Sequence, residues 1–304
     1  MNRYGVIDVG SNTIHLLVGE VENGEVLPIT GEKISVRLGA GTERTGKLEE
    51  ERLTLAAETI RLFAKISSLN GVSEPVILAT SAVRDAENGP QLGEKVLEFT
   101  GLQMRLISGK EEAALGFRGA GSAVATSWQG STLVVDLGGG SAQLVVGKAS
   151  SGPLMQVSLP LGTNRTTERF VGHDPANKKE LRALDEYVKD LMPGWELSAR
   201  VPVVAVGGSA RAVLKITQDR LTVERLRRLA VEITEYSSAV LARTYGLAPE
   251  RARVLPAAVT TLAAILDHFG KMELTVARGG VREGAILLLA DEARNESVEN
   301  GKAE

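Results

Sequence analysis

Residues 6–19 read VIDVGSNTIHLLVG, and residues 134–147 read VVDLGGGSAQLVVG. In each stretch an apolar run ends in an aspartate, Asp8 or Asp136, and a turn of small residues leads to a second apolar run. This pattern predicts two short antiparallel strands joined by a tight turn. Between positions 6–20 and 134–148, an ungapped offset of 128 gives six identities in fifteen. We therefore predict a duplicated fold, with coincidence between two unrelated hairpins as the alternative.

The remaining sequence predicts further strands and helices around each hairpin. In the first half, an Asn-Gly turn predicts a third strand, and helical spacing then alternates with short apolar runs. This half reads β-β-β-α-β-α-β, with its later elements at 26–29, 48–69, 76–79, 90–100 and 104–107. In the second half, the predicted strands lie at 155–159 and 201–206, and the predicted helices at 177–192, 222–245, 255–269 and 282–295. The fold class is therefore α/β, and 304 residues suffice for two domains.

The composition excludes several classes of protein. A formal net charge of −3 argues against a cationic protein that wraps nucleic acid, so no nucleic-acid partner is expected. The absence of cysteine excludes disulfides, thiolate nucleophiles and zinc–thiolate sites, and it fits a reducing compartment. The first apolar stretch is cut short by Asp8, so we expect no signal peptide, and no uncharged run approaches the roughly 20 residues that a membrane span needs. We expect a cytoplasmic protein without a membrane partner.

The small residues of the two turns favour anion binding. Backbone amides in a tight turn form a concave anion site, and hydroxyl and carboxamide groups add donors. A third turn, between the strand at 201–206 and a helix, would add amides and Arg211. The predicted phosphate-binding residues are Gly10, Ser11, Asn12 and Thr13, then Gly138, Gly139, Gly140 and Ser141, and finally Gly207, Gly208 and Ser209.

The two aspartates at the strand ends, Asp8 and Asp136, are candidate metal ligands. Magnesium is the natural ion, because Mg²⁺ accepts one or two carboxylates together with waters and phosphate oxygens. A plain tight turn without a ligand is the alternative for each hairpin taken alone.

Five motifs occur in order along the chain: DVGSN at 8–12, TSAVRDAEN at 80–88, ISGKEEA at 107–113, DLGGGS at 136–141 and REG at 282–284. Together they resemble the exopolyphosphatase/guanosine pentaphosphate phosphohydrolase (Ppx/GppA) family over nearly the whole chain. The resemblance implies two ribonuclease-H-like domains flanking a cleft, as in the actin, sugar-kinase and heat-shock-chaperone superfamily. These would be residues 1–124 and 125–304, with the final helix at about 284–296 packing back on the first domain.

The same resemblance implies a reaction and its site. The family hydrolyses the terminal phosphoanhydride of inorganic polyphosphate, or the 5′-γ-phosphate of guanosine pentaphosphate, usually with Mg²⁺. Glu112 matches the glutamate that acts on water, Arg84 the arginine that faces the phosphate chain, and Arg165, more loosely, a further phosphate-binding candidate. From the residues alone, Glu111 and Glu112 could instead be helix N-terminal charges, and Arg84 a solvated arginine. Dimers are common in the family, so a homodimer is a candidate assembly.

One position departs from the family pattern. Gln143 stands where the family usually has a glutamate that is thought to hold metal or activate water. A carboxamide can contact a metal or a water, but it cannot accept a proton near neutral pH. Gln143 therefore enters the predicted catalytic set as a replacement, and two readings stay open. The chain is an exopolyphosphatase that relies on Glu112, or a low-turnover regulator that binds polyphosphate or nucleotide.

Overall fold

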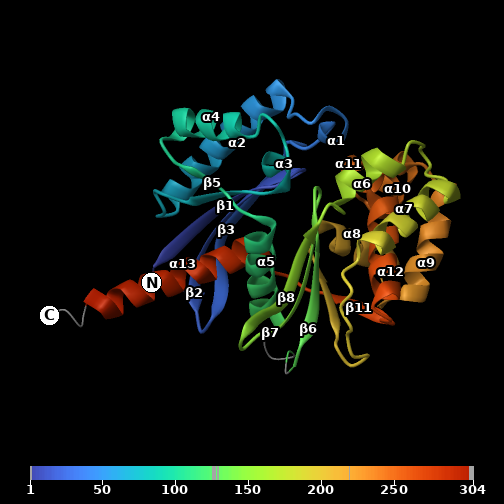
Figure 1. Cartoon of the computed structure of the whole chain (residues 1–304). Coiled ribbons are helices and arrows are strands. Elements are labelled where there is room, and N and C mark those ends of the chain that lie inside the picture. Colours follow the sequence, from blue (N-terminus) through green and yellow to red (C-terminus); the bar gives the residue numbers. More distant parts are fainter. Residues whose placement is uncertain (1, 125–127, 129, 219, 301–304) are drawn as a thin grey trace. The chain divides into compact units, whose positions relative to one another are not determined.

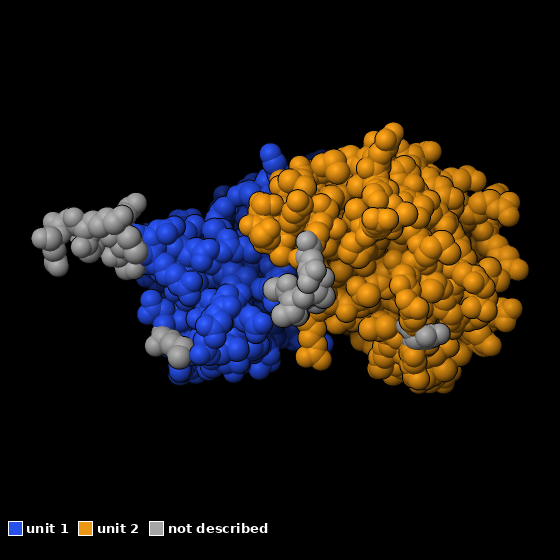
Figure 2. All heavy atoms as spheres, turned by 90° about the horizontal axis from the view of Figure 1, so that it is seen from below, with its two compact units in different colours: residues 1–127, 279–304 blue, residues 128–278 orange. Residues whose placement is uncertain are grey.

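The computed structural model describes residues 2–124, 128, 130–218 and 220–300, and the chain divides into two compact units. Unit 1 comprises residues 1–127 and 279–304, and unit 2 comprises residues 128–278 (Figure 2, blue and orange). The C-terminal segment therefore belongs to unit 1, although it follows unit 2 in the sequence. No helix in the described ranges is long and apolar enough to cross a membrane.

Unit 1 is built on a five-stranded sheet in the order β3-β2-β1-β4-β5 (Figure 1). The first three strands are antiparallel, as predicted, whereas β4 and β5 run parallel to β1. The strands are β1 (Arg3–Val9), β2 (Thr13–Glu22), β3 (Glu25–Ser35), β4 (Val76–Ala79) and β5 (Met104–Leu106). Because β1, β4 and β5 are parallel, the segments that follow them leave the same edge of the sheet.

Helices cover both faces of this sheet. Ile7 and Val9 of β1 pack into a core with α2, whereas Val6, on the other face of the strand, packs with Val281 and Ile286 of α13. This alternation follows from the period of two in a strand. The helices of unit 1 are α1 (Thr42–Thr45), α2 (Glu50–Leu69), α3 (Ser81–Arg84), α4 (Pro90–Thr100), α5 (Gly109–Val124) and α13 (Val281–Asn300).

Helices α5 and α13 meet backbone to backbone. A Cβ atom added to Gly119 would lie 2.0 Å from the carbonyl oxygen of Gly280, and one added to Gly284 would lie 1.9 Å from that of Leu115. Real Cβ atoms do not approach other atoms so closely, so only glycine fits at this crossing. The last helix of the chain is thereby held tightly against the helix that carries Glu112.

Unit 2 repeats the strand plan of unit 1. Its six-stranded sheet has the order β10-β11-β9-β6-β7-β8, in which β6, β7 and β8 are antiparallel and β9 runs parallel to β6. Asp8 lies opposite His15 across the first hairpin, and Asp136 opposite Gln143 across the second, so the offset of 128 holds on both strands. The strands are β6 (Thr132–Leu137), β7 (Ala142–Lys148), β8 (Gly152–Leu159), β9 (Val203–Val206), β10 (Leu221–Thr222) and β11 (Glu273–Val276). The predicted repeat is present in strand order and in register.

The core of unit 2 is centred on α12, which is buried on every side from Leu255 to Leu266. This stretch is apolar apart from two threonines, as expected of a helix enclosed by other elements. The helices of unit 2 are α6 (Thr163–Phe170), α7 (Lys178–Leu191), α8 (Gly207–Thr217), α9 (Val223–Glu232), α10 (Ser238–Tyr245), α11 (Pro249–Arg253) and α12 (Leu255–His268).

The predicted long helix over 222–245 is wrong. The segment forms α9, a short 3₁₀ helix η1 (Ile233–Glu235) and α10. Tyr236 is extended, and the Ser237 hydroxyl accepts a hydrogen bond from Val240 N, which starts a new helix. Serine before a helix favours this cap over continued helix, so the local chemistry overrides the apolar spacing. Strand β11 was also not predicted.

Candidate functional site

The turns that follow Asp8 and Asp136 have the same closing bond. Gly10 N donates to Thr13 O at 3.3 Å in unit 1, and Gly138 N donates to Ser141 O at 3.0 Å in unit 2. Both aspartates are the penultimate residues of their strands, β1 and β6. The duplication therefore extends from the strands to the hydrogen bonding of the turns.

In unit 1, the segment after β3 fixes the orientation of the first turn. Ser11 O accepts from Gly39 N at 2.8 Å, and Asn12 O accepts from the amides of residues 36 and 37 at 3.1 and 2.8 Å. In a planar trans peptide the carbonyl and the following N–H point in opposite directions. The amides of Asn12 and Thr13 therefore point away from residues 36–39, on the side of the turn where an anion could bind.

In unit 2, the start of α6 does the same for the glycine turn. The carbonyl oxygens of residues 138–140 all accept hydrogen bonds from it. These bonds run from Thr163 N to Gly138 O (2.9 Å), from Asn164 N to Gly139 O (2.8 Å) and from Arg165 Nε to Gly140 O (2.9 Å). The amides of residues 139–141 consequently point the other way as a set of adjacent donors. The Arg165 side chain braces this turn, and its role as a phosphate ligand stays a prediction.

The third predicted turn lies beside Asp136. Gly207 has φ +94°, and a Cβ atom there would be 3.0 Å from Asp136 Oδ1. The strand-to-helix turn at 207–209 can approach the carboxylate this closely because it begins with glycine. β6 and β9 are parallel, so Asp136 near the end of β6 and Gly207 directly after β9 lie at the same edge of the sheet. The structure thus brings the second and third turns together in unit 2.

Arg251, on α11, is a site residue that the sequence analysis missed. Its Nη1 donates to Ser209 Oγ at 3.0 Å, and its Nη2 would be 2.7 Å from a Cβ atom on Gly208. Burial, and then repulsion from the Arg211 cation, lower the pKa of Arg251 below its usual value. Two guanidinium groups thus lie near the glycine turn, an arrangement that an anion would stabilise. Arg251 is remote in sequence from Ser209, and no local pattern marks it.

In unit 1, Arg84 and Glu112 form an ion pair. Arg84 Nη1 lies 3.2 Å from Glu112 Oε2 and also donates to Ile107 O at 3.0 Å. Glu112 is only 8% exposed, so this carboxylate is not a solvated surface charge. Ser81 Oγ, at the start of α3, lies 3.3 Å from Ser11 Oγ, which joins the segment carrying Arg84 to the first turn. The predicted residues of unit 1 therefore gather at one edge of the sheet.

Glu111 has a different role from its neighbour. It accepts from Ser108 N at 2.8 Å, and its own amide donates to Ser108 Oγ at 3.1 Å, which is a capping box at the start of α5. These bonds, with a further one from Arg105, lower the pKa of Glu111 to about 2. The helix-terminal interpretation is thus right for Glu111, whereas Glu112 faces inward.

Gln143 is almost fully enclosed, with 2% of its surface exposed. Its amide Nε2 donates to Ser141 Oγ at 2.8 Å and to Ser158 Oγ at 2.9 Å. Since both hydroxyls accept from Gln143, their own hydrogens are directed to other acceptors. Gln143 therefore orients the hydroxyl of the glycine turn, beside Asp136 on the neighbouring strand.

His15 is the counterpart of Gln143 in the first hairpin. Its Nδ1 lies 3.3 Å from Arg282 Nη1, on the first turn of α13. Nδ1 can take part in a hydrogen bond from a guanidinium only as an acceptor. Arg282 of the REG motif therefore contacts β2, the strand that follows the first turn.

The predicted metal ligands Asp8 and Asp136 belong to different units. Within the described residues, no group of three or more His, Cys, Asp or Glu side chains could hold a metal ion. Mg²⁺ does not require such a group, because waters and phosphate oxygens complete its shell. Asp136 fits this use as a single carboxylate beside the glycine turn, where phosphate oxygens and waters would supply the remaining ligands.

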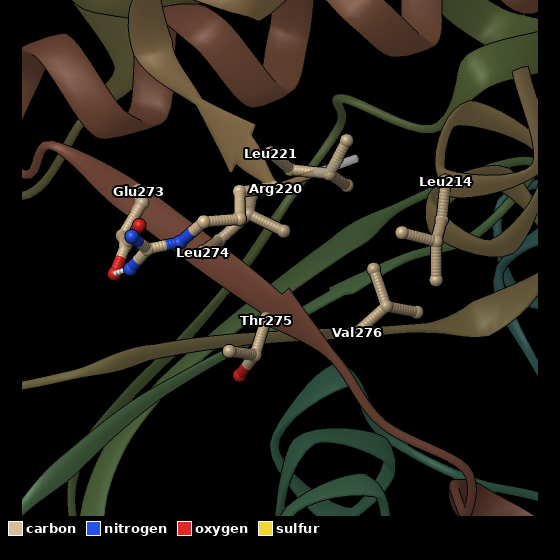
Figure 3. A pocket seen from close by; sticks show the side chains of 7 residues that line it. All are labelled: Leu214, Arg220, Leu221, Glu273, Leu274, Thr275 and Val276. Carbon is tan, nitrogen blue, oxygen red and sulfur yellow. Dashed lines mark hydrogen bonds and ion pairs between the residues drawn. The ribbon is translucent and has the colours of Figure 1, made fainter. Parts of the chain in front are cut away.

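A cavity of about 200 Å³ lies elsewhere in unit 2, next to α8, β10 and β11 (Figure 3). An ion pair between Arg220 and Glu273 lies at this cavity, and Leu214 and Leu274 give it an apolar lining. None of the predicted site residues lines it. The cavity is therefore distinct from the phosphate-binding turns.

Comparison with known proteins finds relatives that match nearly the whole chain. Exopolyphosphatase 1 of Mycobacterium tuberculosis is 30% identical over 306 residues, which cover 95% of this chain and 88% of that protein. The protein of the same name from Mycobacterium leprae is also 30% identical, with 95% and 90% covered.

Solved structures support the fold. The structure of an exopolyphosphatase from Cytophaga hutchinsonii has a TM-score of 0.85 and is 24% identical in sequence to this chain. The match covers 96% of this chain and 98% of that one. The structure of the Aquifex aeolicus PPX-GPPA enzyme has a TM-score of 0.77 at 26% identity, with 94% and 98% covered. The sequence model of the Ppx/GppA phosphatase family matches residues 17–293. On this match and the mycobacterial relatives, the chain belongs to the Ppx/GppA phosphatase family.

Proposed function

We propose that this protein is an exopolyphosphatase that hydrolyses the terminal phosphoanhydride of inorganic polyphosphate and releases orthophosphate. The observation that carries the proposal is the pair of duplicated turns, in which the carbonyls of residues 11, 12 and 138–140 accept hydrogen bonds from the protein, so that the amides that follow them form candidate anion sites. The relatives named exopolyphosphatase, at 30% identity over nearly the whole chain, support the choice of polyphosphate.

In this proposal, Glu112 is the general base. Its carboxylate accepts a proton from the water whose oxygen attacks the terminal phosphorus, and the bond from that phosphorus to the bridging oxygen breaks. The electron pair stays on the bridging oxygen, which becomes the new end of the shortened chain. Arg84, held at Nη1 by Glu112 and Ile107 O, has further N–H donors for phosphate oxygens. The chain's main contribution is positioning and charge neutralisation, as is general in phosphoryl transfer.

Magnesium belongs to the same proposal. In unit 2, Asp136 would hold an ion, and Asp8 is the corresponding candidate ligand in unit 1; a bound ion supplies neutralisation of charge on the phosphate oxygens. Gln143 brings no charge to the site in unit 2, so a metal there depends on Asp136 and on the substrate.

The two neighbouring glutamates provide a matched test. Glu112→Gln should lower kcat for phosphate release by roughly 10²–10⁴-fold, because the general base is lost. Glu111→Gln should leave kcat largely unchanged, since glutamine also completes a capping box. Both variants are compared with wild type on long and short polyphosphates, with Mg²⁺ and with a chelator. Absence of phosphate release by wild type at every chain length would refute the proposal, and equal rates for the two variants would refute the role of Glu112.

Guanosine pentaphosphate is measured in the same assay. Removal of its 5′-γ-phosphate is the same attack on a different leaving group, so an activity comparable to that on polyphosphate would extend the proposal to this nucleotide. Its absence would restrict the substrate to polyphosphate.

A further inference from the structure

The helix that carries Arg251 is too short to be stable by itself. α11 spans only the five residues Pro249–Arg253, and its N-cap residue, Ala248, makes no side-chain hydrogen bond to the helix. A single helical turn is unfavourable without tertiary contacts, because nucleation fixes several residues for few hydrogen bonds. The place of the Arg251 guanidinium beside Ser209 therefore depends on the contacts that hold α11.

Arg253, the last residue of α11, bonds the helix to the segment that follows α6. Its Nη2 donates to Val171 O at 2.7 Å, and its Nη1 donates to His173 O at 3.1 Å. The planar guanidinium presents its donors as a fork that can reach two oxygens at once. Residues two apart on a helix differ in direction by about 200°. Arg253 therefore holds α11 from the side opposite to Arg251.

The segment that accepts these bonds is itself held by two other helices. Glu180, in the first turn of α7, accepts hydrogen bonds from Gly172 N at 2.8 Å and from His173 N at 3.1 Å. Asp174 accepts a hydrogen bond from Ser238 N, at the start of α10, at 2.7 Å. The support to which α11 is bonded is therefore fixed by α7 and α10.

The same segment continues from the helix that braces the glycine turn. α6 bonds residues 138–140 with its first residues, and Val171 is its C-cap. At the start of α6, Thr163 Oγ1 lies 3.5 Å from Ser209 Oγ, the atom to which Arg251 donates. α6 and α11 are therefore linked twice, through the segment after Val171 and through Ser209.

We propose that Arg253 is a positioning residue of the phosphate site. By bonding the carbonyls after α6, Arg253 fixes α11 at the place from which the Arg251 guanidinium reaches Ser209 in the third turn. Arg253 itself does not touch the bound anion. The proposal rests on the proposed function for the identity of that anion, whereas the positioning rests on the hydrogen bonds within unit 2.

Calorimetric titration of the full chain with orthophosphate and tripolyphosphate is the first test. Arg253→Met should bind both anions roughly tenfold more weakly, because α11 loses its anchor. Arg253→Lys should recover part of the affinity, since an ammonium group can still donate to a carbonyl. Arg225→Met is the matched control and should bind as wild type does, because Arg225 pairs with Glu232 on its own helix, α9. Unchanged affinity in Arg253→Met overturns the proposal.

A double-mutant cycle with Arg251→Met separates positioning from a merely structural role. If Arg253 acts through Arg251, its loss has nothing further to misplace once the Arg251 guanidinium is gone. The double variant should then bind tripolyphosphate as weakly as Arg251→Met alone. Thermal unfolding verifies that each variant keeps its fold. Additive losses of affinity, with the fold retained, would show that Arg253 affects the site by another route and would overturn the proposal.

Hydrogen exchange separates failure of this proposal from failure of the proposed function, because it needs no phosphate. The amides of residues 251 and 252 donate to Ala248 O, and in Arg253→Met they should exchange about tenfold faster than in wild type. Arg225→Met should leave them unchanged. If wild type binds no phosphate, the proposed function fails, and faster exchange in Arg253→Met would still support the anchoring of α11. Unchanged exchange of α11 in Arg253→Met overturns the proposal whether or not the protein binds phosphate.

Discussion

Glu111 and Glu112 show how far adjacent residues of one type can differ in use. Glu111 is held by Ser108 and Arg105 at the exposed start of α5, whereas Glu112 turns inward to Arg84. From the residues alone, both interpretations were open for both residues. The distinction depends on which way the first turn of α5 faces, and this is set by packing.

Gln143 permits a prediction about metal binding. Gln143→Glu would place a second carboxylate beside Asp136 in a buried position, where burial and the like charge both oppose ionisation. We expect the variant to be less stable than wild type in a chelator, by about 1–3 kcal/mol. Mg²⁺ should raise its Tm more than that of wild type, because the added carboxylate is a further ligand.

The measurement is thermal unfolding with and without Mg²⁺. Gln103→Glu, at an exposed position, is the control for the charge change alone. If Mg²⁺ shifts the Tm of all three proteins equally, the ion does not bind beside Asp136.

We predict that replacing Arg251 weakens phosphate binding without lowering the stability of the free protein. Its pKa is lowered by burial and by the Arg211 cation, so the free protein holds this charge at a cost. Arg251→Met should therefore be as stable as wild type, or more stable, in the absence of phosphate. It should bind orthophosphate or short polyphosphate about tenfold or more weakly, because a charge-assisted hydrogen bond is lost.

Calorimetric titration with orthophosphate and tripolyphosphate tests the affinity, and thermal unfolding tests the stability. Arg228→Met is the matched control, since Arg228 is largely exposed and forms an ion pair with Glu224 on its own helix. Unchanged affinity in Arg251→Met would remove this residue from the phosphate site.

At the scale of elements, local patterns predicted most strands and helices. The three opening strands, β4, α4 and α12 occur where apolar spacing and turn residues place them. The prediction failed for two different reasons. The break between α9 and α10 depends on a local serine cap that the apolar spacing concealed, whereas the short strand β11 forms by tertiary pairing with β9 and β10.

The same limit applies to the phosphate turns. Their small residues identified them, but the direction of their amides depends on partners that the turn sequence does not contain. In unit 2 those partners begin at Thr163, and in unit 1 they lie after β3. Arg251 likewise reaches Ser209 only because α11 folds back to the third turn.

The crossing of α5 and α13 predicts a contrast between glycines. Gly119→Ala and Gly284→Ala would each force a methyl group into a backbone carbonyl, so each should lower the free energy of unfolding by about 1–3 kcal/mol or more. Gly93→Ala is the matched control inside α4. Its Cβ would meet only Met104 Cε at 3.5 Å, and alanine favours helix, so it should stabilise by up to about 1 kcal/mol.

Urea unfolding of the three variants measures these differences. A neutral effect of Gly119→Ala would show that the two helices can separate without loss of stability.

At the scale of the whole molecule, the duplication organises the protein. Both sheets have the same strand order around a hairpin with an aspartate, and each unit provides one turn with aligned amides. The sequence offset of 128 predicted this repeat. The assignment of the last helix to unit 1 came from family resemblance, because no local pattern says where a terminal helix packs.

That assignment predicts the result of a truncation. Removal of residues 281–304 would uncover Val6, Leu17 and Leu78, which pack against α13 on one face of the unit 1 sheet. Unit 1 should lose protection from hydrogen exchange throughout its sheet, whereas unit 2, a continuous segment with its own core, should keep it. Hydrogen-exchange mass spectrometry measures both, with removal of residues 301–304 as the control. Equal loss in the two units would show that unit 2 also depends on α13.

The split of unit 1 between the two ends of the chain has a consequence during synthesis. The ribosome completes the strands of unit 1 early, but α13 emerges only after all of unit 2 has been made. Until then, one face of the sheet lacks its covering helix, and α5 lacks the glycine contact that fixes it. The nascent chain therefore carries an exposed apolar surface for most of its elongation, which is the state that chaperones bind. The helix that presents Glu112 reaches its final packing only after α13 has been translated.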